Sequence, residues 1–260
     1  MKRPQITGET IWITGASAGI GLALAKKLCQ HNTVIISGRH QDTLDRIVEQ
    51  HPSMKAVVFD VTDKAQISTV QTALIELTPY LDRVILNAGN CEYFSIDKPD
   101  WLIMERMMQV NFLGMVHSVQ ASLELLKQAS KQNKLPHIVG IGSQAIQAPF
   151  TKAEGYGASK AAVSYWLDSL RIDLAGLGID VSEILPGFVD TRLTQKNDFP
   201  MPFLMSVDEA AERIIKGIVK RPLQYAFPKR LTGLLWLARR FPRRWMALQQ
   251  QGVSAKDKSD

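Results

Sequence analysis

The sequence has few of the residues on which disulfide-rich, metal-binding and membrane-spanning proteins depend. Cys29 and Cys91 are its only cysteines, so no disulfide framework can form and a reducing compartment is expected. None of its five histidines forms an i, i+4 pair that would place two ligands on one helical face, so we predict no metal site. No apolar run approaches the roughly 20 residues of a spanning helix, and the first residues lack the apolar core of a signal peptide. These absences predict a cytoplasmic protein, either free or peripheral to the inner membrane surface.

Acidic residues are missing from one part of the chain. The segment from Arg213 to Lys256 contains eleven Lys or Arg residues and no Asp or Glu, a balance of +11. Because the whole chain of 260 residues carries +6, the rest of it carries −5. A protein that reads nucleic acid through its main domain would carry its basic residues there, so no nucleic-acid partner is expected.

What the chain does contain is a regular alternation of short apolar runs and longer amphipathic segments. The apolar runs lie near residues 11–13, 34–36, 56–59, 84–86, 138–141 and 179–185, and helix-length segments such as 64–78 and 112–132 lie between them. This alternation is typical of βαβ units, which build an α/β, doubly wound parallel sheet with helices on both faces. We predict one such domain over residues 1–228 and a basic, amphipathic extension over residues 229–260.

The first apolar run ends in a glycine-rich turn. Gly15, Gly19 and Gly21 would allow a tight turn, a close approach of the backbone to a pyrophosphate and close packing of the next helix against the sheet. The backbone N–H groups at the start of that helix would then face the phosphates. An ordinary loop between strand and helix is the alternative, so the turn needs support from other residues.

The end of the second run, Ser37-Gly38-Arg39-His40, indicates which dinucleotide is bound. It lacks the carboxylate that would bond the ribose hydroxyls and repel a 2′-phosphate. Arg39 instead offers a planar cation suited to phosphate. NADP(H) is therefore the preferred cofactor. If Arg39 is only a solvated loop residue, NAD(H) is the alternative.

A tyrosine and a lysine one helical turn apart suggest acid–base chemistry. Tyr156 and Lys160 lie in a segment with a helical pattern, and an ammonium beside a phenol would lower the phenol pKa toward neutrality. The spacing alone is weak, because Tyr225 and Lys229 share it with Pro228 between them. Ser143, just after the fifth run, adds a hydroxyl that could polarise a substrate oxygen.

These residues, in this order, resemble those of the classical short-chain dehydrogenase/reductase family. Asp60-Val61 closes the third run, where the family contacts adenine, and Asn87-Ala88-Gly89 closes the fourth and matches the family's Asn-Ala-Gly motif. The residues that match family motifs are Thr14, Gly15, Gly19, Gly21, Asp60, Asn87, Ala88, Gly89, Asn111, Ser143, Tyr156, Lys160, Pro186, Gly187 and Thr191. The match runs through nearly the whole predicted domain, and each motif falls at the expected place.

The resemblance implies a Rossmann fold with a seventh strand at 224–227, and a hydride transfer between NADP(H) and a small carbonyl or alcohol. In it, Tyr156 protonates the carbonyl oxygen, Lys160 lowers the tyrosine pKa, Ser143 orients the substrate and Asn111 holds a water. The cofactor-binding residues expected are Gly15, Ser17, Gly19, Ile20, Gly21, Arg39, Asp60, Val61, Asn87, Ala88, Gly89, Tyr156, Lys160, Pro186, Gly187 and Thr191. A homodimer or homotetramer is also implied. A silent NADP-binding regulator is the competing function.

Two segments leave alternatives open. Residues 192–205 should form a lid over the nicotinamide, and their Phe and Met residues either favour a hydrophobic substrate or pack on the body. The C-terminal segment has leucines near helical spacing beside Arg239, Arg240, Arg243 and Arg244, with Pro242 expected to end its first helix. It either covers the substrate cleft or an interface, or lies on an anionic membrane. Residues 127–136 are predicted to be a polar surface extension.

Overall fold

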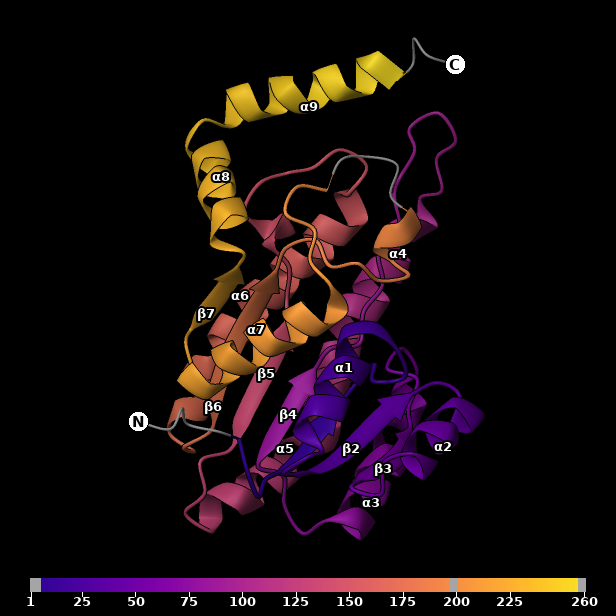
Figure 1. Ribbon diagram of the computed structural model, residues 1–260, viewed down its shortest axis with the longest axis vertical. Coiled ribbons are helices and arrows are strands. Elements are labelled where there is room, and N and C mark those ends of the chain that lie inside the picture. The colour runs from indigo at the N-terminus through magenta and orange to yellow at the C-terminus, as the bar shows by residue number, and fades with distance from the viewer. Residues whose placement is uncertain (1–5, 197–200, 257–260) are drawn as a thin grey trace.

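The computed structural model describes residues 6–196 and 201–256, and a parallel sheet lies at its centre (Figure 1). Within this part of the chain the strand order is β3-β2-β1-β4-β5-β6-β7, and all neighbours are parallel. The strands are β1 Thr10–Ile13, β2 Thr33–Gly38, β3 Met54–Val58, β4 Arg83–Leu86, β5 His137–Ile141, β6 Asp180–Pro186 and β7 Gln224–Phe227. The predicted doubly wound α/β fold is confirmed, together with its seventh strand.

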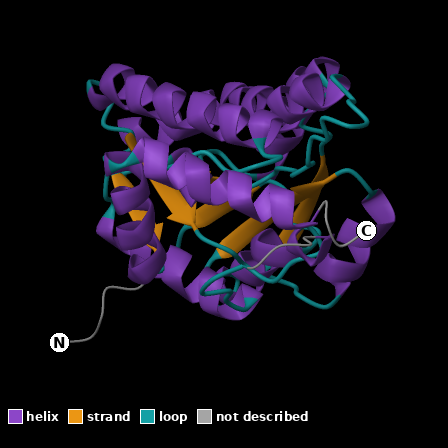
Figure 2. Cartoon of the chain, turned by 90° about the horizontal axis from the view of Figure 1, so that it is seen from above, coloured by secondary structure: helices purple, strands orange, loops and turns teal. Residues whose placement is uncertain are grey.

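Helices cover both faces of this sheet, as Figures 1 and 2 show. Ile11 and Ile13 of β1 join one core and Trp12 the other, because alternate residues of a strand point to opposite faces. The central strands are therefore rich in apolar residues on both faces. One face carries α1 Gly19–Leu28, α2 Gln41–Glu49 and α7 Val207–Lys220, and the other carries α3 Ile67–Leu77, α5 Gly114–Lys131 and α6 Glu154–Ala175.

The order of the strands reverses between β1 and β4. The chain runs from β1 through β2 to β3, then crosses back to β4 on the other side of β1 and continues to β7. Loops after β1 and β4 therefore leave toward opposite sides, and a crevice opens between the carboxyl ends of these two strands. Ligands bind at this point in open α/β sheets.

The helical segment between β4 and β5 starts earlier than predicted. The sequence predicts one helix over residues 112–132, whereas α4 Leu102–Met107, a π-helical turn Met108–Leu113 and α5 follow one another without a break. Within the segment predicted as a polar surface extension, residues 127–131 form the last turn of α5, and all of them except Ala129 are exposed or half-buried. Leu126 and Ala129 are buried there, and their burial keeps this polar stretch helical.

The chain continues into two helices, α8 Lys229–Arg240 and α9 Pro242–Lys256, at one end of the molecule (Figure 1). The expected break is confirmed, because α8 ends before Pro242, which begins α9. Leu231 and Leu235 on the inner side of α8 are buried. No helix in the described part of the chain is long and apolar enough to cross a bilayer.

Candidate active site

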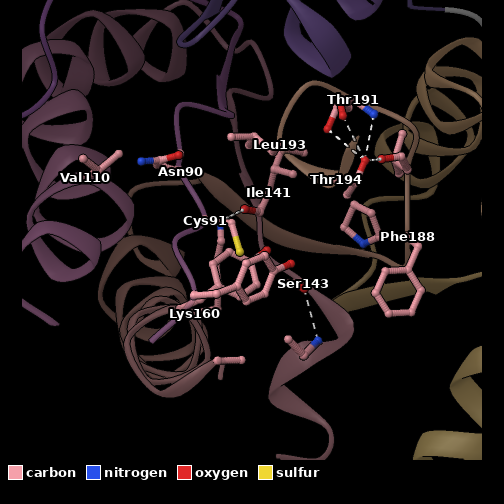
Figure 3. A pocket seen from close by; sticks show the side chains of 18 of the residues that line it. Asn90, Cys91, Val110, Ile141, Ser143, Lys160, Phe188, Thr191, Leu193 and Thr194 are labelled. Carbon is pink, nitrogen blue, oxygen red and sulfur yellow. Dashed lines mark hydrogen bonds between the residues drawn. The ribbon is translucent and has the colours of Figure 1, made fainter. Parts of the chain in front are cut away.

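A cavity of about 1490 Å³ opens at the crevice between the carboxyl ends of the strands. Its walls come from the loops after β1 to β6, from α6 and from the two C-terminal helices; Figure 3 shows part of it. All of the predicted site residues line it except Gly21 and Asn111, which lie behind its wall. The fold thus brings together residues that are distant in the sequence.

Two side chains join the ends of β1 and β4. The Thr14 hydroxyl accepts hydrogen bonds from the backbone N–H groups of Asn87 at 3.1 Å and Ala88 at 3.2 Å. The side-chain amide of Asn87 donates in return to the carbonyl oxygens of Thr14 at 3.2 Å and Gly15 at 3.0 Å. These reciprocal bonds hold the glycine turn against the loop after β4 and so set the width of the crevice.

Two positions, one in the turn and one in the first residues of α1, admit only glycine. Gly15 has a φ of +64°, and a Cβ atom on it would lie 2.7 Å from the Cα atom of Ala88. Behind the turn, a Cβ atom on Gly21 would lie 2.3 Å from the carbonyl oxygen of Gly15. The turn therefore presents bare backbone to the cavity, and α1 starts directly beneath it.

The N-terminus of α1 lies at the cavity without a side-chain cap. Ala18 precedes the helix and provides no capping hydrogen bond, while Gly19 and Ile20 line the cavity. The first N–H groups of a helix have no partner within it, so this end offers donors and a positive dipole to an anion. Thr191 also lines the cavity, and its methyl carbon is 3.7 Å from where a Cβ atom on Gly19 would lie.

Arg39 and Asp60 line the cavity beyond the turn. Arg39 is exposed, and it forms no ion pair with a carboxylate of the described residues. Oδ1 of Asp60 accepts hydrogen bonds from the N–H and hydroxyl groups of Thr62 at 2.9 and 2.7 Å. The Val61 carbonyl is bonded to Nδ1 of His117 at 2.8 Å. These bonds orient the loop after β3, whereas the Arg39 guanidinium stays available.

Ser143, Tyr156 and Lys160 meet at the cavity wall. Ser143 follows β5; its hydroxyl accepts a hydrogen bond from the Ala145 N–H at 3.1 Å and also bonds the side chain of Tyr156. Tyr156 and Lys160 lie one turn apart on α6, as predicted. Lys160 is 5% exposed, and its Nζ donates to the Ile141 carbonyl at 2.9 Å.

Burial changes the acidity of two of these groups in opposite directions. Desolvation raises the pKa of Tyr156 to about 12, although the hydrogen bond with Ser143 opposes this, and it lowers the pKa of Lys160 to about 8. The predicted lowering of the Tyr156 pKa is therefore wrong for this arrangement. Burial removes the solvation that a phenolate would need. The Lys160 amine, which was expected to stabilise the phenolate, is instead bonded to the Ile141 carbonyl. At neutral pH Tyr156 keeps its proton.

Asn111 connects the loop after β4 to α6. Its Oδ1 accepts from the Asn90 N–H at 2.8 Å, and its Nδ2 donates to the Asn90 carbonyl at 3.0 Å and to the Ser159 hydroxyl at 2.9 Å. Ser159 lies between Tyr156 and Lys160 on α6 and donates to the Tyr156 carbonyl at 2.8 Å. The buried amide thus holds the two segments together. The water-holding role that the resemblance implies stays a prediction.

Other residues of the cavity wall belong to no motif in the sequence. Asn90 and Cys91 directly follow Gly89, and both are labelled in Figure 3. The Cys91 thiol is hydrogen-bonded to Tyr93, and its burial raises its pKa. Only their place beside the Asn-Ala-Gly motif could have pointed to them.

The end of the cavity beneath α8 and α9 is apolar. Phe150 packs edge-on against Phe188 and Trp245, with ring centroids 6.5 and 5.5 Å apart. The indole N–H of Trp245 donates to the Pro149 carbonyl at 2.6 Å and so ties α9 to the body. Further wall residues are Leu231, Leu234, Leu235 and Leu248. The inner sides of the two helices therefore cover the cleft, which was one of the alternatives for this segment.

The predicted lid lies only partly over the cavity. Met205 is 4% exposed and packs into the core beside α7, so it belongs to the body. Phe203 and Leu204 are largely exposed, and Phe199 and Pro200 lie outside the described residues. The lid residues that do line the cavity are Arg192, Leu193, Thr194 and Pro202.

A buried carboxyl group lies behind the wall that carries Ser143. Glu183 on β6 is inaccessible to solvent, and its Oε2 accepts from Ser164 Oγ and Gln224 Nε2, both at 2.8 Å. Its Oε1 has no hydrogen-bond partner among the described residues, and a Cβ atom on Gly142 would lie 2.6 Å from it. Burial raises the pKa of Glu183.

Glu183→Gln is expected to stabilise the protein more at pH 8 than at pH 5. Because the pKa of Glu183 is raised in the folded state, the stability of the unmodified protein falls as pH rises above the ordinary range of a glutamate, and a glutamine lacks this loss. We expect a gain on the order of 1 kcal/mol at pH 8, measured as the melting temperature across this pH range. The control is Glu76→Gln, which makes the same change at an exposed position on α3. The prediction would be contradicted if the melting temperatures of the Glu183 variant and the unmodified protein differed by the same amount at every pH.

Comparison with known proteins agrees with this geometry. A family model described as short chain dehydrogenase matches residues 9–200. An oxidoreductase of Myxococcus xanthus (strain DK1622) is 32% identical over 243 residues, which are 92% of this chain and 94% of the relative. A fatty acyl-CoA reductase of Acinetobacter baylyi (strain ATCC 33305 / BD413 / ADP1) is 30% identical over 234 residues, 86% of this chain and 77% of the relative.

Solved structures show the same fold. A crystal structure of a short chain dehydrogenase from Burkholderia cenocepacia J2315 in complex with NADP superposes with a TM-score of 0.77. The two chains are 21% identical, and the match covers 97% of this chain and 98% of the other. The family model spans most of the chain and includes the glycine turn, Ser143, Tyr156 and Lys160. The chain therefore belongs to the short chain dehydrogenase family of oxidoreductases, which act on carbonyl and alcohol groups.

Proposed function

We propose that this protein transfers a hydride between NADP(H) and an apolar carbonyl or alcohol. The observation that carries the proposal is that Ser143, Tyr156 and Lys160 meet in one cavity with the glycine turn after β1. With a pKa of about 12, Tyr156 keeps the proton that a reduction must deliver to the substrate oxygen.

The cavity wall suits a dinucleotide along its length. The uncapped N-terminus of α1 and the bare backbone at Gly15 would bind the pyrophosphate, and Arg39 would bind the 2′-phosphate. Asp60 and Val61 would contact the adenine. The remaining residues proposed for the cofactor are Ser17, Gly19, Ile20, Gly21, Asn87, Ala88, Gly89, Tyr156, Lys160, Pro186, Gly187 and Thr191. When bound, the nicotinamide supplies or accepts the hydride.

The four proposed catalytic residues divide the remaining work. The Ser143 hydroxyl would bond the substrate oxygen and orient it, and Tyr156 would donate its phenolic proton to that oxygen as negative charge develops. Lys160 has a pKa of about 8, so it is largely charged at neutral pH and would stabilise the phenolate left on Tyr156. Asn111 would act indirectly, through its bonds to Asn90 and Ser159.

The apolar end of the cavity supports a substrate with a hydrocarbon part. Phe150, Phe188 and the leucines of α8 form a wall on which such a chain would lose its contact with water. The relative from Acinetobacter baylyi is named for a fatty acyl substrate, which also supports an extended apolar group. Polar contacts would be confined to the end at Ser143 and Tyr156.

The first experiment is a titration of the purified protein with NADPH and with NADH, followed by the fluorescence of the bound nicotinamide. We expect tighter binding of NADPH. NADPH oxidation with a series of straight-chain aldehydes should then show kcat/KM rising by up to about fourfold per added CH₂ group until the apolar end is filled. Failure to bind either nucleotide would contradict the proposal. A kcat/KM that does not change with the chain length of the aldehyde would contradict an apolar substrate.

Two leucines on α8 provide a matched pair for this series. Leu234 lines the cavity and is 44% exposed, whereas Leu237 is 48% exposed and is not part of the wall. Leu234→Ser should flatten the dependence on chain length, and Leu237→Ser should leave it unchanged. Equal effects of the two changes would mean that the apolar end does not hold the substrate.

Three further expectations stay predictions. One is a homodimer or homotetramer, and another is a cytoplasmic location. The third is the division of the chain near residue 228, which falls between β7 and α8. The inner side of α8 packs against the body. The segment after residue 228 would therefore be a cover over the cavity of the main domain and not a second independent domain.

A further inference from the structure

The outer surface where α8 meets α9 carries a dense group of basic and aromatic side chains. We call it the α8–α9 corner and define it as Trp236, Arg239, Arg240, Phe241, Arg243 and Arg244. Trp236 is 66% exposed and Phe241 46%, and all four arginines are exposed. In Figure 1 the two helices stand at one end of the molecule, beyond the carboxyl ends of the strands.

The charges of the corner are not neutralised within the described part of the chain. None of its four arginines forms an ion pair there, whereas Arg106, Arg171 and Arg221 elsewhere each bind a carboxylate. From residue 229 to 256 the sequence contains no Asp or Glu at all. The guanidinium carbons of Arg240 and Arg244 instead lie 5.8 and 5.6 Å from the ring centroid of Phe241.

The inner side of α8 is enough to cover the cleft, so the composition of its outer side needs a separate explanation. Leu231, Leu235 and Ala238 on the inner side are buried against the body, so the cover is complete without the outer side. Trp236 and Arg240, four residues apart, share the outer side. An exposed tryptophan and phenylalanine among unpaired arginines match the composition of helices that lie in the interface of an anionic bilayer.

We propose that the α8–α9 corner binds the surface of an anionic lipid bilayer. The arginines would meet the lipid phosphates, and Trp236 and Phe241 would enter the headgroup region. A nucleic acid would also attract the arginines, but it gives no reason for exposed apolar rings beside them. The wall residues Leu234 and Leu248 belong to the same helices, so docking would bring the apolar end of the cavity close to the bilayer.

Sedimentation of the full chain with vesicles tests this inference without any assay of activity. We expect binding to vesicles of phosphatidylcholine with phosphatidylglycerol, little binding to phosphatidylcholine alone, and weaker binding as salt rises. Replacing Arg239, Arg240, Arg243 and Arg244 by Gln should weaken binding at least about tenfold. The matched control replaces the exposed residues Lys26, Lys55, Lys131 and Lys216 by Gln, which changes the net charge equally and should preserve binding.

A second variant separates insertion from simple charge attraction. Trp236→Ser combined with Phe241→Ser keeps every charge, and it should still weaken vesicle binding severalfold. It should also remove a blue shift of tryptophan fluorescence that Trp236 gives on binding. Circular dichroism before each assay shows that the variants are folded.

Three results would overturn the inference. One is equal vesicle binding by the arginine and lysine variants, because the corner would then add nothing beyond net charge. Another is unchanged binding by the aromatic variant. The third is double-stranded DNA bound more tightly than the vesicles, which would assign the corner to a nucleic acid.

Discussion

Tyr156→Phe is expected to lower the turnover of carbonyl reduction by roughly 10²–10⁴-fold, the usual contribution of a positioned proton donor. The phenol lines the cavity, bonds Ser143 and keeps its proton at neutral pH, since its pKa is about 12. Phenylalanine keeps the ring and its packing, so cofactor affinity should stay within about threefold. Initial rates with NADPH, together with nucleotide titration, measure both quantities.

The control for this change is on the same helix. Tyr165→Phe also removes one hydroxyl from α6, but its side chain is 79% exposed and lies outside the cavity wall. It should leave turnover unchanged. Turnover by Tyr156→Phe equal to that of the unmodified protein would show that another group supplies the proton. If the unmodified protein binds NADPH but turns over no carbonyl substrate, the alternative function, a catalytically silent NADP-binding regulator, is the better explanation.

Arg39→Ala is expected to weaken NADPH binding by about 10- to 100-fold and to leave NADH binding nearly unchanged. The guanidinium of Arg39 lines the cavity just after β2 and has no ion-pair partner among the described residues, so it is available to the 2′-phosphate. A charge-assisted hydrogen bond of this kind contributes about 1.5–3 kcal/mol. Dissociation constants for both nucleotides, measured for both proteins, give the change in preference directly.

Arg46 on α2 supplies a matched control. It is exposed as well, but its Nε donates to the Asp42 carbonyl at 3.1 Å and it is not part of the cavity wall. Arg46→Ala should change neither affinity. If Arg39→Ala weakens both nucleotides equally, Arg39 contacts a group that they share rather than the 2′-phosphate. If it weakens neither, the interpretation of Arg39 from the sequence is wrong.

Residues near one another in the sequence were the most predictable part of this protein. The turn from Thr14 to Gly21 could be interpreted because its glycines meet local demands, a left-handed φ at Gly15 and a close contact at Gly21. Tyr156 and Lys160 could be placed on one helix face because their spacing is one turn. The strand at 224–227 followed from the family pattern rather than from its own residues.

Long-range packing explains where prediction from the sequence failed. The pKa of Tyr156 depends on how deeply the fold buries the phenol and on the bond between Lys160 and the Ile141 carbonyl, which joins α6 to β5. Oε1 of Glu183 lacks a hydrogen-bond partner among the described residues where β6 packs against Gly142, although Ser164 on α6 donates to Oε2. Asn90 and Cys91 line the cavity on a loop that Asn111 binds through the backbone of Asn90.

Local patterns in the chain were therefore enough to predict the order of the elements, the family and the groups available for chemistry, because helix periodicity, strand alternation and glycine turns are set by neighbours in sequence. The tertiary structure decided how deeply each group is buried, which sides of α8 and α9 face the cavity and which stay exposed, and which motifs share one wall. The reason is that desolvation and packing depend on contacts between segments distant in sequence, and no local pattern records those contacts.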